Sequence, residues 1–158
     1  YLAVGRRDEA RGAYERAEAL ARPLVPSQVG ATRIGSYPAR LRRQINEDNL
    51  DAAMDTVTQW YDQFPATMGD GQLPLWIGKV HRLAGRPAIA LPALTLARQL
   101  TSGTPYEAEA RWQLARTHQA LGNTNAYRQR LRAIANEPTN RYQTSAKRAL
   151  DKMTDEKD

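Results

Sequence analysis

Hydrophobic positions recur along the chain at the three- and four-residue spacing of amphipathic helices. The clearest example is the apolar series Leu50, Ala53, Val57, Trp60 and Phe64, with intervals of three, four, three and four residues. This spacing places the series on one face of a helix, and Pro65 marks the end of that helix. The pattern therefore predicts an amphipathic helix that ends at a proline.

The segment from Thr104 to Pro138 predicts two such helices joined by a tight turn. Thr104, Pro105 and Glu107 are the capping residue, the first-turn proline and the carboxylate that are typical of a helix start. Gly122 suits the left-handed backbone that ends a helix. We expect a helical hairpin whose second helix turns Tyr127, Leu131 and Ile134 inward.

Similar helical patterns occupy most of the remaining chain. They predict helices at 38–46, 50–64, 74–84 and 87–100, a helix after Gly5, and a closing helix from Tyr142 to Met153. Residues 66–71 are expected to form a loop, and Pro92 is expected to kink its helix because proline removes a backbone hydrogen bond. The alternating pattern of strands is absent. The sequence therefore predicts an all-α fold.

The turns between paired helices recur at a nearly constant distance. They are expected at Gly5, near Glu47, at Gly85 and at Gly122, with intervals of 42, 38 and 37 residues. Such a recurrence is typical of stacked hairpins that bury their apolar faces on one another. We therefore expect an α-solenoid of about four antiparallel hairpins with a C-terminal capping helix, forming one domain over residues 1–153, and then a polar tail at 154–158.

These features resemble the tetratricopeptide repeat (TPR) family. The resemblance rests on the turn glycines, on Ala17 and Ala97 in second helices, on Tyr14, and on the closing prolines Pro26, Pro65, Pro105 and Pro138. It implies a right-handed superhelix that binds a peptide or protein in a concave groove. The chain departs from the family at Glu47, where glycine is usual, and at His81 and His118, where a bulky aromatic residue often stands.

The resemblance also implies which residues line the groove, namely those six and three positions before each turn and one position after it. They are Leu41, Gln44 and Asp48, then Lys79, Arg82 and Arg86, then Arg116, Gln119 and Asn123. Because the last six are basic or amide-bearing, the expected ligand is an acidic or carboxylate-ended peptide. The same spacing also fits the exposed side of a buried helix, where arginine and lysine are ordinary.

The charge balance leaves two kinds of partner open. The net charge is +6, and 19 arginines stand against 4 lysines. Guanidinium groups suit both carboxylate and phosphate partners, so nucleic acid is the alternative to a peptide. A GC-rich genome accounts equally well for the arginine excess. A further alternative is that the segment only spaces or supports an attached domain.

Signals for other classes of function are missing from the sequence. There is no glycine-rich phosphate loop, and the serines and carboxylates form no recognisable catalytic motif, so we expect no enzyme. The chain has no cysteine, and its histidines His81 and His118 lack further ligands, so no metal or cofactor is expected.

The sequence gives little information on the compartment. No apolar run approaches the roughly 20 residues of a membrane span, so we expect no membrane insertion. Tyr1 to Gly5 resembles the end of a helix, which suggests a fragment of a longer chain. The C-terminal run resembles the last repeat of bacterial cell-envelope TPR proteins, and this implies the cell envelope or periplasm.

Overall fold

The described part of the protein is built from helices. The computed structural model describes residues 36–156, and no strand occurs among them. The helices are α3 (Ser36–Asn46), α4 (Leu50–Gln63), the 3-10 helix η1 (Pro65–Asp70), α5 (Gln72–Leu83), α6 (Pro87–Leu100), α7 (Glu107–Ala120), α8 (Thr124–Ala135) and α9 (Gln143–Asp155). The all-α prediction is confirmed for this part. The helix predicted after Gly5 lies outside the described residues.

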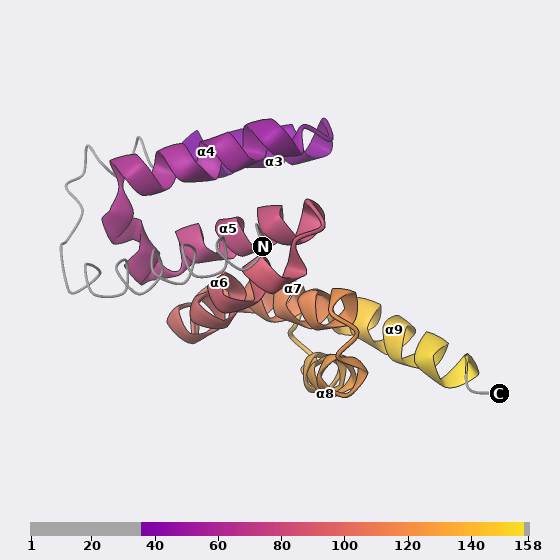
Figure 1. The fold of residues 1–158 in the computed structure, drawn as a ribbon. Helices are drawn as coiled ribbons and strands as arrows, with labels where there is room; N and C mark the ends of the chain where they lie inside the picture. Colours follow the sequence, from indigo (N-terminus) through magenta and orange to yellow (C-terminus); the bar gives the residue numbers. More distant parts are fainter. Residues whose placement is uncertain (1–35, 157–158) are drawn as a thin grey trace.

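The α-helices from α3 to α8 form antiparallel pairs, with α9 at the C-terminal end (Figure 1). Short turns join α3 to α4, α5 to α6 and α7 to α8. Each α-helix packs on the next one along the chain, and α5 also contacts both α3 and α7. First helices therefore contact one another across neighbouring pairs. Within residues 36–156, every helix is too short or too polar to span a lipid bilayer.

The pairs repeat every 37 residues. Their first helices end at Asn46, Leu83 and Ala120, and their second helices begin at Leu50, Pro87 and Thr124. Each turn contains one residue with a positive φ, namely Asp48 (56°), Gly85 (74°) and Gly122 (74°). The next amide donates to the carbonyl five residues earlier in all three turns: Asn49 to Gln44, Arg86 to His81 and Asn123 to His118, at 2.8, 2.8 and 2.9 Å. This is the hydrogen bond of a Schellman C-cap.

The first of these turns lies one residue later than the sequence predicted. The turn was expected at Glu47, but the residue with left-handed backbone is Asp48. Aspartate visits this conformation more readily than most residues with a side chain, so no glycine is needed. The corresponding groove positions shift from Leu41, Gln44 and Asp48 to Arg42, Ile45 and Asn49. Leu41 is fully buried, as a core residue would be.

The hydrophobic core follows the same repeat. Leu41 and Val57 share one core cluster, and their equivalents Ala115 and Leu131 share another. At the equivalent place in the middle pair, Gly78 lies so close to Leu94 that an added Cβ would be 2.3 Å from the Leu94 Cγ. A large side chain thus faces a small residue where α5 meets α6, and glycine permits this close approach.

Residues 66–71 were predicted to be a loop, and most of them belong to the 3-10 helix η1 instead. The hydroxyl of Thr67 donates to the carbonyl of Phe64 at 2.7 Å, and Met68 is buried in the core. Gly71 ends the turn with a φ of 82°. A buried methionine on so short a segment produces no periodic pattern, which explains why the sequence did not indicate this helix.

The start of α7 and the end of α9 also differ from the predictions. The Thr104 hydroxyl accepts from the amide of Tyr106 (3.3 Å) and the Glu107 carboxylate accepts from the amide of Gly103 (2.8 Å), so these groups close a turn that precedes α7. At the other end, α9 continues through Asp155, and the first two residues of the predicted polar tail are helical. The hydroxyl of Thr154 donates to the carbonyl of Leu150 at 3.1 Å.

Candidate functional site

Cationic side chains recur on the first helices at the 37-residue spacing. Arg42 on α3, Lys79 on α5 and Arg116 on α7 form what we call the basic ladder. Arg42 Cζ and Lys79 Nζ lie 5.7 and 5.2 Å from the ring centroid of Trp76. Arg116 Cζ lies 5.7 Å from that of Trp112. Cation–π attraction therefore helps to hold all three side chains in place. The sequence prediction missed Arg42 because it placed the first turn one residue early.

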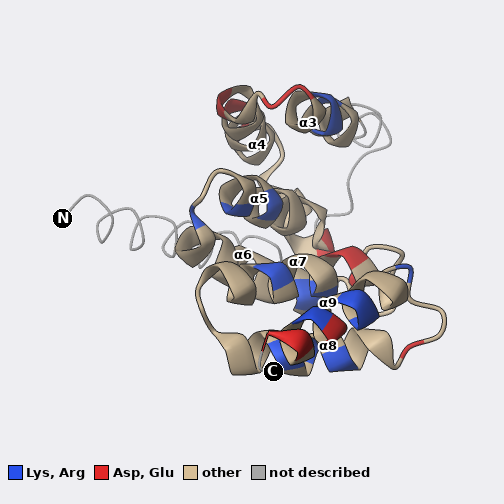
Figure 2. Cartoon of the chain, turned by 90° about the vertical axis from the view of Figure 1, so that its right-hand side faces the viewer, with Lys and Arg blue, Asp and Glu red and all other residues tan. Residues whose placement is uncertain are grey.

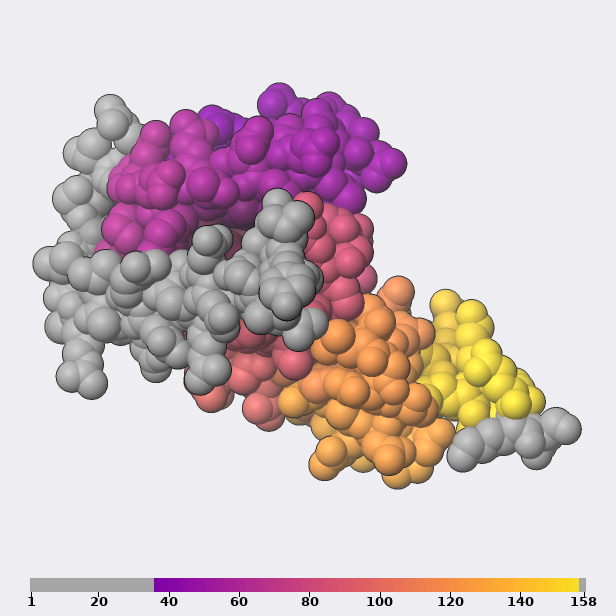
Figure 3. All heavy atoms as spheres, in the orientation of Figure 1, coloured from indigo at the N-terminus to yellow at the C-terminus, as the bar shows by residue number. Residues whose placement is uncertain are grey.

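The basic ladder borders a hollow side of the molecule. Arg42, Trp76 and Lys79 line a cavity of about 490 Å³ formed by α3, α5, the start of α7 and the residues before α9. Arg116 lines a second cavity of about 460 Å³ between α7 and α9. The molecular surface is hollowed between α5 and the yellow helix α9 (Figure 3). Figure 2 faces this side and shows lysine and arginine segments on α5, α7 and α9.

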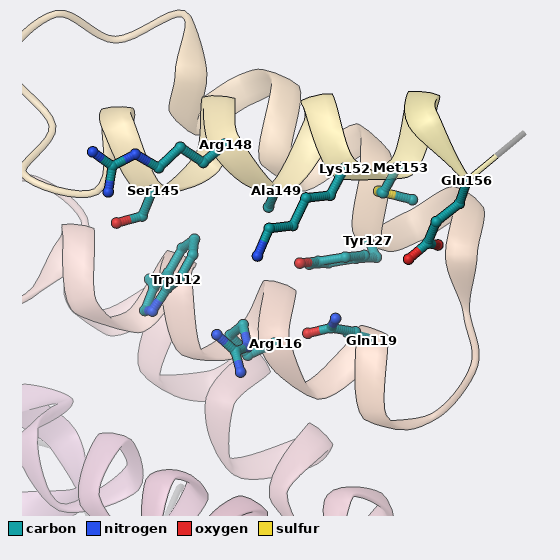
Figure 4. Close-up of a pocket in the computed structure, with 10 residues that line it drawn as sticks. All are labelled: Trp112, Arg116, Gln119, Tyr127, Ser145, Arg148, Ala149, Lys152, Met153 and Glu156. Atoms are coloured by element: carbon teal, nitrogen blue, oxygen red, sulfur yellow. The ribbon is translucent and has the colours of Figure 1, made fainter. Parts of the chain in front are cut away.

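The cavity between α7 and α9 is lined mainly by charged and aromatic side chains (Figure 4). From α7 come Trp112, Arg116 and Gln119. From α9 and its C-cap come Arg148, Lys152 and Glu156, and the Lys152 side chain extends toward α7. Because three cations stand against a single carboxylate, the cavity has a positive balance that favours anionic ligands.

Arg148 and Lys152 were not among the groove residues predicted from the sequence. Both side chains are exposed, but they also line the cavity. The spacing of Ser145, Arg148, Lys152 and Glu156 by three or four residues was available as a signal, since it places them on one helical face. The sequence did not show that this face lies opposite Arg116.

A nearly buried carboxylate, Glu109, lines the same cavity as Arg42 and Lys79. Its side chain is 12% exposed and accepts hydrogen bonds from Lys79 (3.2 Å), Gln113 (2.8 Å), Arg141 (2.5 Å) and the hydroxyl of Tyr142. Lys79 and Arg141 therefore share one neutralising partner. The sequence prediction did not single out Glu109.

The pKa values of this network follow from burial and hydrogen bonding. Burial acts to raise the pKa of Glu109, but the hydrogen bond from Tyr142, the charge of Lys79 and the hydrogen bond from Gln113 outweigh it, and the pKa lies below its ordinary value of 4.5. Burial and the hydrogen bond to Glu109 raise the pKa of Tyr142 to about 12. At neutral pH the carboxylate is therefore charged and the phenol is protonated.

The other predicted groove residues differ in burial and in their hydrogen-bond partners. Arg82 is half-buried, and its Nε donates to Gln113 at 2.9 Å. Burial, and then the charge of Arg116, lowers its pKa, while Glu109 opposes this shift. Arg86 and Asn123 are exposed N-cap residues of α6 and α8. The structure thus brings Arg116 and Gln119 together in one cavity and places Lys79 in the other.

The two histidines are partly buried and occupy equivalent turns. Burial and the charge of Arg86 lower the pKa of His81 to about 4, and burial followed by the charge of Arg130 lowers that of His118. The His81 ring is therefore neutral at pH 7. His118 Nδ1 lies 3.3 Å from the side-chain nitrogen of Asn123. Among residues 36–156, no group of three or more histidine, aspartate or glutamate side chains is placed to hold a metal ion.

The helices and the hollow side define an all-α protein with a positively charged surface supported by tryptophans. Comparisons with models of protein families, with curated proteins and with solved structures found no match to the chain. Its function therefore has to be inferred from the geometry of this surface.

Proposed function

We propose that the chain is a TPR-like α-solenoid that binds an acidic or carboxylate-ended peptide segment along its hollow side. In this proposal the protein is a non-catalytic interaction or scaffolding module, built as a right-handed superhelix of about four hairpins. The resemblance of the C-terminal run to bacterial cell-envelope TPR proteins supports that compartment as part of the proposal.

The 37-residue recurrence supports the solenoid. Helix ends, turn hydrogen bonds and core positions all repeat at this interval through the described pairs. The contacts of α5 with α3 and α7 are those expected when each repeat rests on its neighbours. The hydrophobic face of each pair is thereby buried on the next pair.

The observation that carries the binding proposal is the set of unpaired cations on the hollow side. Arg42, Arg116, Arg148 and Lys152 make no ion pair within the described part of the chain, whereas Lys79 is paired with Glu109. Unpaired guanidinium and ammonium groups that line a cavity are suited to carboxylates, because charge-assisted hydrogen bonds are stronger than neutral ones. An extended peptide with several carboxylates would meet these cations one after another.

The tryptophans favour a peptide over nucleic acid, which is the alternative partner. Single-stranded nucleic acid is commonly held by bases stacked on aromatic rings. Trp76 is only 8% exposed, and the ring of Trp112 is stacked on Tyr142 with centroids 5.0 Å apart.

Fluorescence anisotropy with labelled peptides tests this proposal. The probes are a ten-residue peptide of aspartate and glutamate with a free C-terminus, its C-terminal amide, and an asparagine–glutamine analogue of the same length. We expect the acidic peptide to bind and the neutral analogue not to bind. A tighter complex with the free C-terminus than with the amide would indicate that the terminal carboxylate is recognised.

Matched variants locate the binding side. A hydrogen bond to a charged group contributes about 1.5 kcal/mol, so Arg116→Gln and Lys152→Gln should each weaken binding about tenfold. Lys147→Gln removes the same charge from an exposed position of α9 that does not line the cavity, and it should change affinity less than twofold. Equal losses for Lys147→Gln and Lys152→Gln would contradict the proposal. Tighter binding of a labelled ten-residue oligothymidine would favour the nucleic-acid alternative.

A further inference from the structure

Three arginines from three successive helices meet at a place away from the basic ladder. Arg98 of α6, Arg111 of α7 and Arg130 of α8 line a cavity of about 40 Å³, together with Ala133 and Ile134. None of the three arginines lines either cavity of the hollow side. We call this group the arginine cluster.

The positive charge of the arginine cluster is only partly neutralised. Arg111 is paired with the carboxylate of Glu137, which is the cluster's one ion pair within residues 36–156. The Nε of Arg130 is buried and has no hydrogen-bond partner. A buried donor left without an acceptor is unfavourable, and more so when the group is charged. The cluster therefore presents an unsatisfied donor and an excess of positive charge to a small cavity.

The pKa of Arg130 also reflects the nearby positive charges. Burial, and then the charges of Arg98 and Arg111, lowers its pKa from the ordinary value. Each of the two neighbours thus lies close enough to act on it electrostatically. An anion in the cavity would oppose the effect of these two neighbouring charges on Arg130.

Helix electrostatics explains only one member of the cluster. Arg98 lies in the last turn of α6, where the helix dipole favours a cation. Arg111 lies near the start of α7, where the dipole disfavours a cation, and Arg130 lies in the middle of α8. The ion pair with Glu137 accounts for Arg111, whereas neither the helix dipole nor an ion pair within residues 36–156 accounts for Arg130.

We infer that the arginine cluster is a binding site for a small tetrahedral oxyanion, either free phosphate or the phosphate group of a small monoester. Guanidinium groups match the oxygens of phosphate with charge-assisted hydrogen bonds. About 10–15 Å³ is enough to hold one water molecule, so a cavity of about 40 Å³ has room for a group of a few atoms. The anion would contact α6, α7 and α8 together and would therefore link two successive helix pairs.

Isothermal titration calorimetry with inorganic phosphate tests the site, with sodium chloride at the same ionic strength as the blank. We expect binding by the wild-type protein and a rise in melting temperature with phosphate, because a ligand that binds only the folded state stabilises it. Phenyl phosphate is the second probe. Tighter binding of phenyl phosphate would identify a monoester as the ligand, and tighter binding of phosphate would identify the free anion.

Three variants separate this site from general charge effects. Arg130→Gln and Arg98→Gln should each weaken phosphate binding at least tenfold. Arg132→Gln removes the same charge from an exposed position on α8 and should leave the affinity unchanged. Arg98 is itself exposed, so its replacement is expected to preserve the fold. The inference is overturned if neither probe binds the wild-type protein, or if Arg132→Gln weakens binding as much as the two cluster variants.

Discussion

Replacement of Gly78 by alanine should lower the free energy of unfolding by about 1–3 kcal/mol. The new Cβ would lie 2.3 Å from Cγ and 2.6 Å from Cδ2 of Leu94. Leu94 is fully buried and cannot swing into solvent to make room. In a helix interior, alanine is otherwise favoured over glycine by about 1 kcal/mol. A net loss would therefore show that the steric clash dominates. Urea denaturation followed by circular dichroism measures the difference.

Repeating Gly78→Ala in a Leu94→Ala variant shows whether the clash with Leu94 causes the loss of stability. Leu94→Ala removes the opposing side chain, although by itself it should cost about 2–5 kcal/mol. In that background Gly78→Ala should be neutral or stabilising, because only the helix preference for alanine remains. The same loss in both backgrounds would contradict the proposed contact between α5 and α6.

Glu109→Gln should lower the free energy of unfolding by about 2 kcal/mol at pH 7. Removing one partner of a buried ion pair costs about 3–5 kcal/mol, and we take a smaller value because Lys79 and Arg141 are 26% and 61% exposed and regain water. Asp55→Asn removes a negative charge from an exposed position on α4 and should change stability by less than about 0.5 kcal/mol. Chemical denaturation of both variants checks the difference.

The effect of Glu109→Gln should depend on pH in a defined direction. The folded pKa of Glu109 lies below its ordinary value of 4.5, so its ionisation stabilises the protein above that pH. This contribution is lost as the pH falls through the lower folded pKa. The stability difference between wild type and Glu109→Gln should therefore be constant near neutrality and shrink in acid. A difference that grows as the pH falls below 4.5 would contradict the network.

Periodic spacing was sufficient to predict most helices, because each buries an apolar face at intervals of three and four residues. The helices at 50–64 and 87–100 were predicted to within one residue of α4 and α6. Features set by a local hydrogen bond or by a tolerated backbone angle were missed, as at η1 and at Asp48. With the first turn at Asp48, the turns at Asp48, Gly85 and Gly122 are separated by two equal intervals of 37 residues.

The candidate site was predicted only in part, because its partners are distant in the sequence. Lys79 and Arg116 were predicted as groove residues from their positions relative to the turn glycines Gly85 and Gly122. Glu109 was not singled out, since nothing local shows that α5 brings Lys79, and the residues before α9 bring Arg141, to the same carboxylate. Lys152 was not among the predicted groove residues, because its position opposite Arg116 depends on how α9 packs.

Photo-crosslinking tests the proposed binding side most directly. The photoreactive residue p-benzoylphenylalanine is introduced in place of Gln119, in the cavity between α7 and α9, or of Gln99, at an exposed position on α6. The account predicts that the labelled acidic peptide is captured by the protein carrying the probe at position 119 and not by the one carrying it at position 99. Capture at position 99 alone, or equal capture at both positions, would contradict binding along the hollow side.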